Sequence, residues 1–236
     1  MKNVVHLALA MAVATLLVPS SVAATIAERL EQYGPAARAR LSPYFQKHGV
    51  AYPPAQIAFI GLKQEKLLQV YGRNGTNGFV WIRSYSIRAA SGGPGPKLRE
   101  GDRQVPEGIY GIESLNPNSR FHLSLRVDYP NAFDREQARK ENRTGLGGDI
   151  MIHGNAVSIG CLAMGDEAAE DLFVLAADTG LKNITVVLSP VDFRENKTVP
   201  SLAKLPAWTA SLYETLRTEL KQFPEEPIAK LGAESK

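Results

Sequence analysis

The sequence contains very little cysteine: Cys161 is the only thiol among 236 residues. An intramolecular disulfide and a Cys-x-x-Cys metal site are both excluded, because each needs a second cysteine. Histidine is also scarce, with four in the chain. These histidines are isolated from one another, so a metal site has little support and we expect no cofactor. A lone thiol in an exported protein favours a chemical role for Cys161 over a structural bridge.

The chain also lacks blocks of like charge, internal repeats and low-complexity tracts. Lysine and arginine number 27 against 24 acidic residues, which gives a formal net charge of +3. This balance argues against nucleic acid as a partner, because such proteins concentrate positive charge on one face. Hydrophobic residues make up 44% of the sequence, which suffices for a sizeable core.

The first 24 residues have the pattern of a secretory signal peptide. Lys2 precedes an apolar stretch from Val4 to Val18, and small residues follow up to Ala24. We expect cleavage after Ala23 or Ala24, export, and a periplasmic location. The alternative is a retained membrane anchor, but the apolar run is short and no stop-transfer pattern follows, so we expect no stable anchor. No cysteine lies near the cleavage site, which excludes a lipoprotein anchor.

Residues 25–52 form the predicted N-terminal helical segment, in two pieces because Gly34-Pro35 interrupts the helical pattern. Beyond it the pattern changes to strands, with residues 56–62 and 67–71 predicted to form a hairpin. Residues 79–89 alternate large and polar side chains, which is typical of one half-buried strand. Further short strands are predicted at residues 109–113, 121–127, 149–153 and 184–188.

Three helices are predicted in the second half of the chain. Residues 132–142 form a short polar helix, and a helix that starts at Asp166 has acidic residues in its first turn. Pro190 and Pro200 mark a linker, and residues 206–223 form an amphipathic helix. Its apolar stripe predicts a core or docking surface. The stripe contains Trp208, Leu212, Leu216 and Leu220.

Residues 91–102 form a loop, because their glycines and prolines disfavour both helix and sheet. Such a loop either crosses the surface without a role or lines a site where the backbone approaches a ligand. The sequence leaves both interpretations open.

His153 and Cys161 are the candidate catalytic pair. His153 ends a predicted strand and Cys161 returns after a short turn, which brings the two side chains together across that turn. A thiol attacks carbonyls as the thiolate, and a nearby imidazole or backbone N–H groups lower its pKa. The amides of Gly160 and Cys161 are candidates for an oxyanion hole. The competing hypothesis is a buried, inert Cys161 and a structural His153; His48 and His122 are expected to be structural or surface residues.

The strand ending in His153-Gly154, followed by Ser158-Ile-Gly-Cys161, resembles the signature of the YkuD-type L,D-transpeptidase catalytic domain. The similarity extends over residues 56–190 and is closest to the YafK-like branch of that family. The blocks that carry it are Ser91 to Lys97, Gly101-Asp102, Pro106 to Tyr110, Tyr129 to Arg135 and Ile152 to Cys161.

The resemblance implies a mostly β, sandwich-like catalytic domain at residues 53–190, with short helices. Residues 25–52 and 191–236 are then helical N- and C-terminal extensions. The implied substrates are peptidoglycan stem peptides. The implied roles are Cys161 as nucleophile, His153 as general base, and Gly154 as the residue whose carbonyl orients the imidazole. Attack at the L-centre of meso-diaminopimelate gives a thioester, and the acceptor that follows decides the reaction.

Two positions depart from the family pattern: Ile159 replaces a frequent histidine and Ala163 a frequent arginine. The YafK-like branch shares this pattern and is associated with hydrolysis of the amide between peptidoglycan and an outer-membrane lipoprotein. This favours an amidase, with a transpeptidase that forms diaminopimelate crosslinks or attaches lipoprotein as the alternative. A non-catalytic envelope-binding module is the second alternative. A papain-like peptidase is disfavoured, because its cysteine precedes its histidine.

Three residues are the candidates for substrate binding: Ser158, Lys97 and Arg135. Lys97 and Arg135 fall inside the matched blocks, and their cations suit stem-peptide carboxylates. Asp134 has two open interpretations. It either orients Arg135 or caps the helix that follows.

Overall fold

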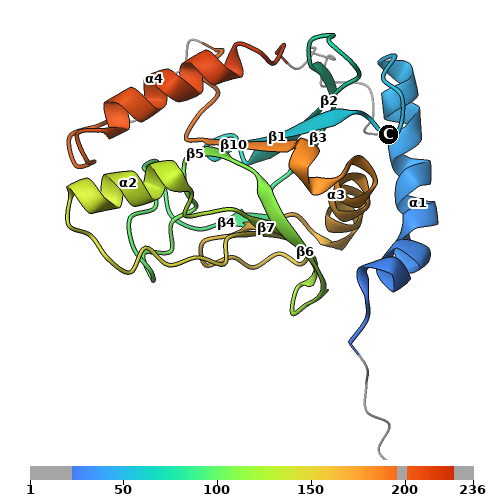
Figure 1. The fold of residues 1–236 in the computed structure, drawn as a ribbon, viewed down its shortest axis with the longest axis horizontal. Coiled ribbons are helices and arrows are strands. Elements are labelled where there is room, and N and C mark those ends of the chain that lie inside the picture. The colour runs from blue at the N-terminus through green and yellow to red at the C-terminus, as the bar shows by residue number, and fades with distance from the viewer. Residues whose placement is uncertain (1–22, 196–200, 226–236) are drawn as a thin grey trace, which may run out of the picture.

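The computed structural model describes residues 23–195 and 201–225. In these ranges the chain forms four α-helices and ten strands, and the strands make two five-stranded sheets (Figure 1). The expected signal peptide falls mainly on residues 1–22, which lie outside the described part. None of the helices in the described ranges is long and apolar enough to cross a membrane.

The first sheet has the strand order β3-β2-β1-β10-β5. Strands β1 (Gln56–Leu62) and β2 (Leu67–Arg73) pair antiparallel, which confirms the predicted hairpin. Strand β10 (Ile184–Ser189) lies parallel to β1 and antiparallel to β5 (Gly108–Tyr110). Strand β3 (Val80–Ser86) forms the other edge beside β2.

The second sheet has the order β4-β9-β8-β7-β6. Its strands are β4 (Ala89–Ala90), β9 (Leu162–Ala163), β8 (Met151–His153), β7 (His122–Val127) and β6 (Ile112–Ser119). Only the β8–β9 pair among these is parallel. One buried cluster joins residues of both sheets, such as Phe59 and Leu125, with residues of helix α3 (Asp166–Thr179), such as Phe173.

The prediction of one strand over residues 79–89 was wrong. Strand β3 ends at Ser86, and the chain crosses to the second sheet as β4. The hydrogen bonds show why: the Ile87 amide donates to the Lys66 carbonyl in the β1–β2 turn, whereas the Arg88 amide donates to Ala163. The backbone therefore changes sheets between two consecutive residues, which local alternation cannot reveal.

The prediction of two N-terminal helical pieces was also wrong, because α1 (Ile26–Lys47) is one helix with Pro35 and Pro43 inside it. A proline disfavours the helical conformation of the residue before it, yet the helix continues through both Gly34-Pro35 and Ser42-Pro43. Its buried face, with Ala37, Leu41 and Phe45, packs against the rest of the fold and stabilises the helix across both prolines. Three ion pairs connect α1 to α3: Arg38 with Asp178 at 2.7 Å, and Arg40 with Asp171 at 2.8 Å and with Glu170 at 3.0 Å.

Helix α4 (Thr209–Leu220) covers the face of the first sheet that points away from the second sheet (Figure 1). Leu212, Leu216 and Leu220 are buried there against Ile60 and other sheet residues. The predicted stripe is therefore core rather than a free docking surface, and Trp208 stands at its edge. Together with α2 (Ala132–Lys140), the helices involve about as many residues as the strands. The structure as a whole is thus a strand-rich mixed α/β fold, in which residues 53–190 are mainly strands and α1 and α4 fall in the expected helical extensions.

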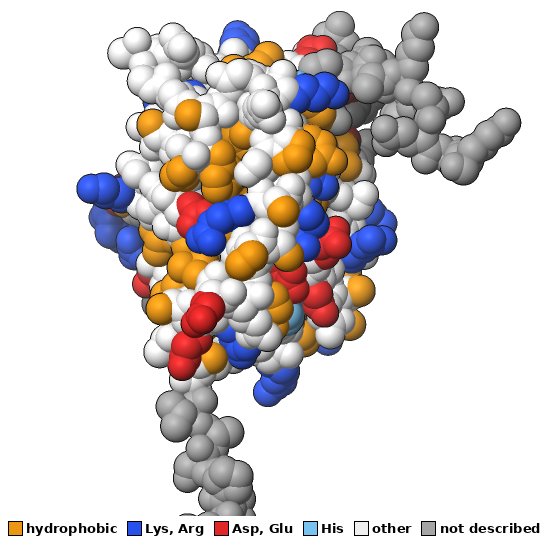
Figure 2. All heavy atoms as spheres, turned by 90° about the vertical axis from the view of Figure 1, so that its right-hand side faces the viewer, with side chains coloured by type: hydrophobic (Ala, Val, Ile, Leu, Met, Phe, Trp, Pro, Cys, Tyr) orange, Lys and Arg blue, Asp and Glu red, His pale blue; other side chains and the backbone are white. Residues whose placement is uncertain are grey.

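Figure 2 looks onto the side of the molecule that carries α1. Acidic and basic side chains are interspersed over this face, and neither sign forms a continuous field. Charge on this side of the molecule is therefore locally balanced, as in the sequence as a whole.

Candidate active site

Strands β8 and β9 place Cys161 and His153 on one face of the second sheet. Ile152 pairs with Leu162 in the parallel register, and both side chains point into the core. Side chains alternate between the faces of a strand. Met151, His153 and Cys161 therefore project from the opposite face, on neighbouring strands. This face is the floor of the candidate site.

The turn that leads into Cys161 is closed by the hydroxyl group of Ser158. This Oγ accepts hydrogen bonds from the amides of Gly160 (3.3 Å) and Cys161 (3.1 Å) and donates to the Cys161 carbonyl (2.6 Å). Gly160 has φ +128°, a backbone conformation that glycine adopts readily. The two amides that the sequence predicts for an oxyanion hole thus have a hydrogen-bond partner within the turn.

The His153 ring is held on both sides. Its Nδ1 atom lies 2.6 Å from the carbonyl oxygen of Gly154, and the ring stacks on Phe121 with centroids 4.8 Å apart. A carbonyl oxygen can only accept, so Nδ1 carries the proton and Nε2 keeps a lone pair. Burial lowers the pKa of His153, and the bond to Gly154 opposes this shift. The imidazole is therefore neutral at pH 7 and able to act as a base.

The Cys161 thiol is also neutral at rest. Its Sγ atom lies 3.4 Å from the donating amide of Met151 and 3.5 Å from the Asp149 carbonyl oxygen. Burial raises the pKa of this thiol; the Met151 amide and the charge of Lys97 lower it, and the charge of Asp149 raises it. The expected lowering of the thiol pKa is thus not found. The cleft thus holds a neutral thiol and a neutral imidazole instead of a preformed thiolate.

A cleft of about 710 Å³ gives access to both side chains. Its lining includes Lys97, Glu100 and Gly101 of the 91–102 loop, and Arg120 and Phe121 of the turn between β6 and β7. The sequence leaves open whether this loop crosses the surface without a role or lines a site, and in the structure it lines the candidate site. The charged residues of the cleft are Lys97, Glu100, Arg103, Arg120, Arg126 and Asp149.

Lys97 lines this cleft, but its ammonium group already has protein partners. Its Nζ atom lies 2.7 Å from Asp102 and 2.8 Å from the Arg99 carbonyl oxygen, and the side chain is 5% exposed. Lys97 therefore stabilises the loop that lines the cleft. Its role in substrate binding stays a prediction, as does that of Ser158, which is not among the residues that line the cleft.

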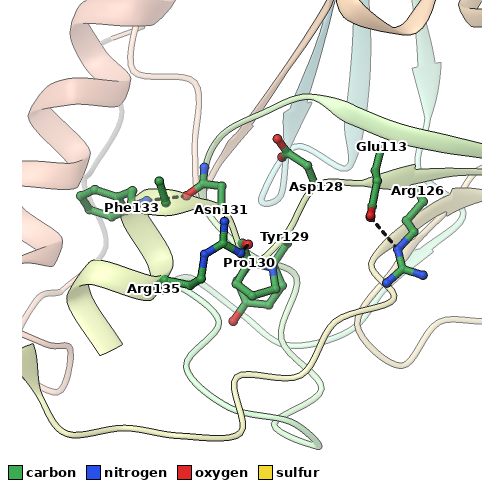
Figure 3. Close-up of a pocket in the computed structure, with 9 residues that line it drawn as sticks. Glu113, Arg126, Asp128, Tyr129, Pro130, Asn131, Phe133 and Arg135 are labelled. Atoms are coloured by element: carbon green, nitrogen blue, oxygen red, sulfur yellow. Dashed lines mark hydrogen bonds and ion pairs between the residues drawn. The ribbon is translucent and has the colours of Figure 1, made fainter. Parts of the chain in front are cut away.

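Arg135 lies in a neighbouring cavity of about 590 Å³ instead of the Cys161 cleft (Figure 3). Its guanidinium donates to the carbonyl oxygen of Pro130. Asp134 accepts from the Asn131 amide at 2.9 Å in a capping box of α2, which supports the capping interpretation for this residue.

Arg126 lines both cavities, and sequence analysis did not select it. The sequence does contain a pattern that could have identified Arg126. Leu123, Leu125 and Val127 are apolar and buried, so the alternation along β7 places Ser124 and Arg126 on the opposite face, with His153.

The other described histidines have structural contacts. His122 lies 3.0 Å from Glu170, and the ring of His48 packs edge-on against Trp81. Within residues 23–195 and 201–225, no three His, Cys, Asp or Glu side chains come together in a group that could hold a metal ion.

A thiol and an oriented imidazole that line one cleft are the groups that a cysteine acyl-transfer site requires. Comparison with known proteins places the chain within this class. The model of the YkuD L,D-transpeptidase catalytic domain matches residues 55–188. The protein therefore belongs to the L,D-transpeptidase catalytic domain family, as the sequence motifs predict. This is a family of peptidoglycan-modifying cysteine enzymes, and it implies stem peptides as substrates.

Two curated relatives are provisionally named L,D-transpeptidase YafK, from Escherichia coli K12 and O157:H7. Each is 38% identical over 113 residues, which cover 47% of this chain and 43% of the relative. The chain thus matches less than half the length of these relatives.

Solved structures resemble the chain more distantly. The helical cell shape determining protein Pgp2 of Campylobacter jejuni is 22% identical with a TM-score of 0.48, over 58% of this chain and 48% of that protein. L,D-transpeptidase 1 of Mycobacterium tuberculosis is 16% identical with a TM-score of 0.33, over 57% and 62%.

Proposed function

We propose that this protein is a periplasmic cysteine enzyme that hydrolyses the amide between the L-centre of meso-diaminopimelate in peptidoglycan and an outer-membrane lipoprotein. One observation carries the catalytic part of this proposal. Nδ1 of His153 is bound to the Gly154 carbonyl, so Nε2 keeps its lone pair, and His153 and Cys161 line the same cleft. The family membership supplies the peptidoglycan substrate.

Acylation starts from the neutral pair. Nε2 of His153 takes the proton from the Cys161 thiol as Sγ attacks the carbonyl carbon of the scissile amide. The C–O π electrons move onto the oxygen and form a tetrahedral oxyanion. The Gly160 and Cys161 amides stabilise this oxyanion when they turn from the Ser158 hydroxyl to the stronger, charged acceptor. The imidazolium then protonates the leaving nitrogen, and a thioester with Cys161 remains.

Deacylation repeats these steps with an acceptor. In hydrolysis, His153 removes a proton from water, the hydroxyl attacks the thioester, and Cys161 leaves with a proton from the imidazolium. The products are a free carboxylate on the stem peptide and the released lipoprotein. The resemblance to the YafK-like branch, in which Ile159 and Ala163 replace a frequent histidine and arginine, favours water as the acceptor. With an amine as acceptor, the same site forms a diaminopimelate crosslink or attaches lipoprotein.

The proposed location follows from the substrate and from the pattern of residues 1–24. A lysine followed by an apolar stretch and small residues is typical of a cleaved signal peptide. Sequencing the N-terminus of the protein recovered from the periplasm tests this part separately. A new terminus at Ala24 or Thr25 is expected.

The reaction is tested with peptidoglycan sacculi that carry covalently attached lipoprotein. The mature protein and its Cys161→Ala and His153→Gln variants are incubated with the sacculi, and mass spectrometry follows released lipoprotein and new crosslinks. His122→Gln is the matched control, since His122 pairs with Glu170 and does not line the cleft.

Release that needs Cys161 and His153 but not His122, without new crosslinks, is the expected result. New diaminopimelate crosslinks with little release would instead identify a transpeptidase. If neither product depends on Cys161, the enzymatic proposal fails and an envelope-binding module remains.

A further inference from the structure

The cavity beside the Cys161 cleft carries charges of both signs in equal number. Its lining contains Glu113 and Asp128 as acids and Arg126 and Arg135 as bases. Figure 3 shows these side chains around one hollow, with Asp128 between the Glu113–Arg126 pair and Asn131. A ligand group with one sign of charge would leave half of these residues without a counterion. A group with both charges suits all four.

Arg126 connects this cavity to the reacting sulfur. It pairs with Met151 in the β7–β8 register, and the Met151 amide donates to Sγ of Cys161. Neighbouring strands lie about 4.8 Å apart, so the Arg126 and Cys161 backbones are separated by about 10 Å across two strand spacings. Both side chains project from the same face, so one small ligand can reach both.

The existing partners of Arg126 can be exchanged. Its Nε lies 2.8 Å from Glu113 and its Nη1 lies 2.7 Å from Asp149, whose side chains are 56% and 76% exposed. Ion pairs this exposed contribute little free energy and are readily replaced.

Asp128 and Arg135, the other two charged residues of the cavity, can each accept a further ionic partner. Asp128 accepts from the Gly111 amide through Oδ1, at 3.0 Å, and forms no ion pair within the described ranges. The guanidinium of Arg135 has a backbone carbonyl as its acceptor and no carboxylate among the described residues.

We propose that this cavity is a subsite for a zwitterionic amino-acid head, in which an ammonium and a carboxylate share one carbon. The ligand carboxylate pairs with Arg126 and Arg135. Glu113, released from Arg126, then binds the ammonium together with Asp128. Each of these four side chains keeps a counterion in this exchange, and Asp149, which is 76% exposed, stays in contact with water, so no charge is buried alone.

The identity of the ligand rests on the proposed function. When the L-centre carbonyl of diaminopimelate is at Cys161, the distal D-centre of the same residue carries an amine and a carboxylate. It lies roughly 6 Å further along an extended chain of single bonds, each about 1.5 Å long. This reach matches the position of the Arg126 side chain, so the subsite would select diaminopimelate over lysine at this position of the stem.

The test measures binding to the Cys161→Ala protein, so that it does not depend on turnover. Calorimetry compares three stem tripeptides that end in diaminopimelate, in diaminopimelate with a distal carboxamide, and in lysine. The free zwitterion is expected to bind about ten-fold more tightly than either analogue, as for the loss of one charge-assisted contact. Arg126→Gln and Asp128→Asn are each expected to abolish this preference. Arg139→Gln is the matched control on α2, since its side chain is 74% exposed and pairs with Glu136.

Equal affinity for the three peptides overturns the subsite, and this comparison needs no cavity variant to fold. A preference that survives in Arg126→Gln and Asp128→Asn overturns it as well. The two proposals fail separately. A zwitterion preference without lipoprotein release from sacculi supports the subsite and removes the amidase, whereas release without any preference supports the amidase and removes the subsite.

Discussion

Nδ1 of His153 lies 2.6 Å from the carbonyl oxygen of the next residue, Gly154. Because this acceptor belongs to the backbone and carries no charge, it orients the imidazole without the negative partner that would stabilise an imidazolium. Burial then lowers the pKa of His153. A backbone carbonyl thus takes the place that a carboxylate has in a Ser-His-Asp triad, and the imidazole is neutral at rest.

The acid side of the pH profile should report this imidazole. Protonation of His153 removes the base, so kcat/KM is expected to rise with pH through an apparent pKa below 6.5, the ordinary value from which burial lowers it. The profile of lipoprotein release between pH 4 and 8 measures it. A midpoint above 6.5 would contradict a neutral, buried base.

The rate of alkylation of Cys161 should report a raised thiol pKa, in contrast to the lowered pKa of His153. The thiol pKa is raised above its ordinary 9.0, mainly by burial, so less thiolate is present at pH 7 than in a free cysteine peptide. We expect iodoacetamide to modify Cys161 more slowly than the peptide at pH 7, with the rate rising beyond pH 9. Mass spectrometry measures the rate of Cys161 modification between pH 6 and 10. A modification rate that is already fast and constant near pH 7 would instead indicate an ion pair between a Cys161 thiolate and His153.

Gly154→Ala is expected to disrupt the site because the added Cβ clashes with neighbouring atoms, and not because of the backbone conformation at this residue. A Cβ at this position would meet the Asp166 Oδ1 at 2.5 Å, the Phe121 carbonyl oxygen at 2.8 Å and the His122 Cβ at 2.9 Å. The backbone around His153 must move, which should cost about 1–3 kcal/mol in the free energy of unfolding and displace the Nδ1 acceptor.

Urea unfolding and turnover of this variant test the prediction. Gly78→Ala is the control, because its Cβ would meet nothing within 4 Å. The control should stay within about 1 kcal/mol of the parent protein. Equal stability and activity for both variants would show that the space around Gly154 is not limiting.

Asp134 should make the protein less stable as the pH rises. Burial raises its pKa from 3.8 to about 6; the Asn131 amide and the Tyr110 hydroxyl oppose this, and the charge of Asp128 adds to it. A carboxyl whose pKa is higher in the folded state stabilises the fold below its unfolded pKa. That contribution is lost as the pH rises through the folded pKa.

Between pH 4 and 7, the parent protein should therefore lose on the order of 2–3 kcal/mol relative to Asp134→Asn, from the two pKa values. Urea unfolding of both proteins at several pH values measures this difference. The asparagine keeps an acceptor for the Asn131 amide of the capping box. Parallel stability curves for the two proteins would mean that Asp134 does not titrate in this range.

Local patterns predicted the β1–β2 hairpin, helices α2 and α3, and the pairing of a strand-ending His153 with Cys161 after a turn. They failed where distant contacts decide the outcome. Helix α1 continues through Pro35 because its buried face packs against the rest of the fold, and the strand after Phe79 ends where Ile87 and Arg88 bond to different sheets. The expected fold class was correct in part: α1 and α4 fall in the predicted helical extensions, and the two sheets together with the helices make the whole a strand-rich mixed α/β fold.

The sequence by itself determined the family and the candidate catalytic residues, because strand alternation, turn residues and the spacing from His153 to Cys161 are properties of a short segment. Only the tertiary structure decided which charges surround them. It placed Arg126, which is remote in sequence, on the same sheet face as Cys161, and it placed Arg135 in the neighbouring cavity. It also made the thiol neutral, because burial depends on every element that packs around the sulfur.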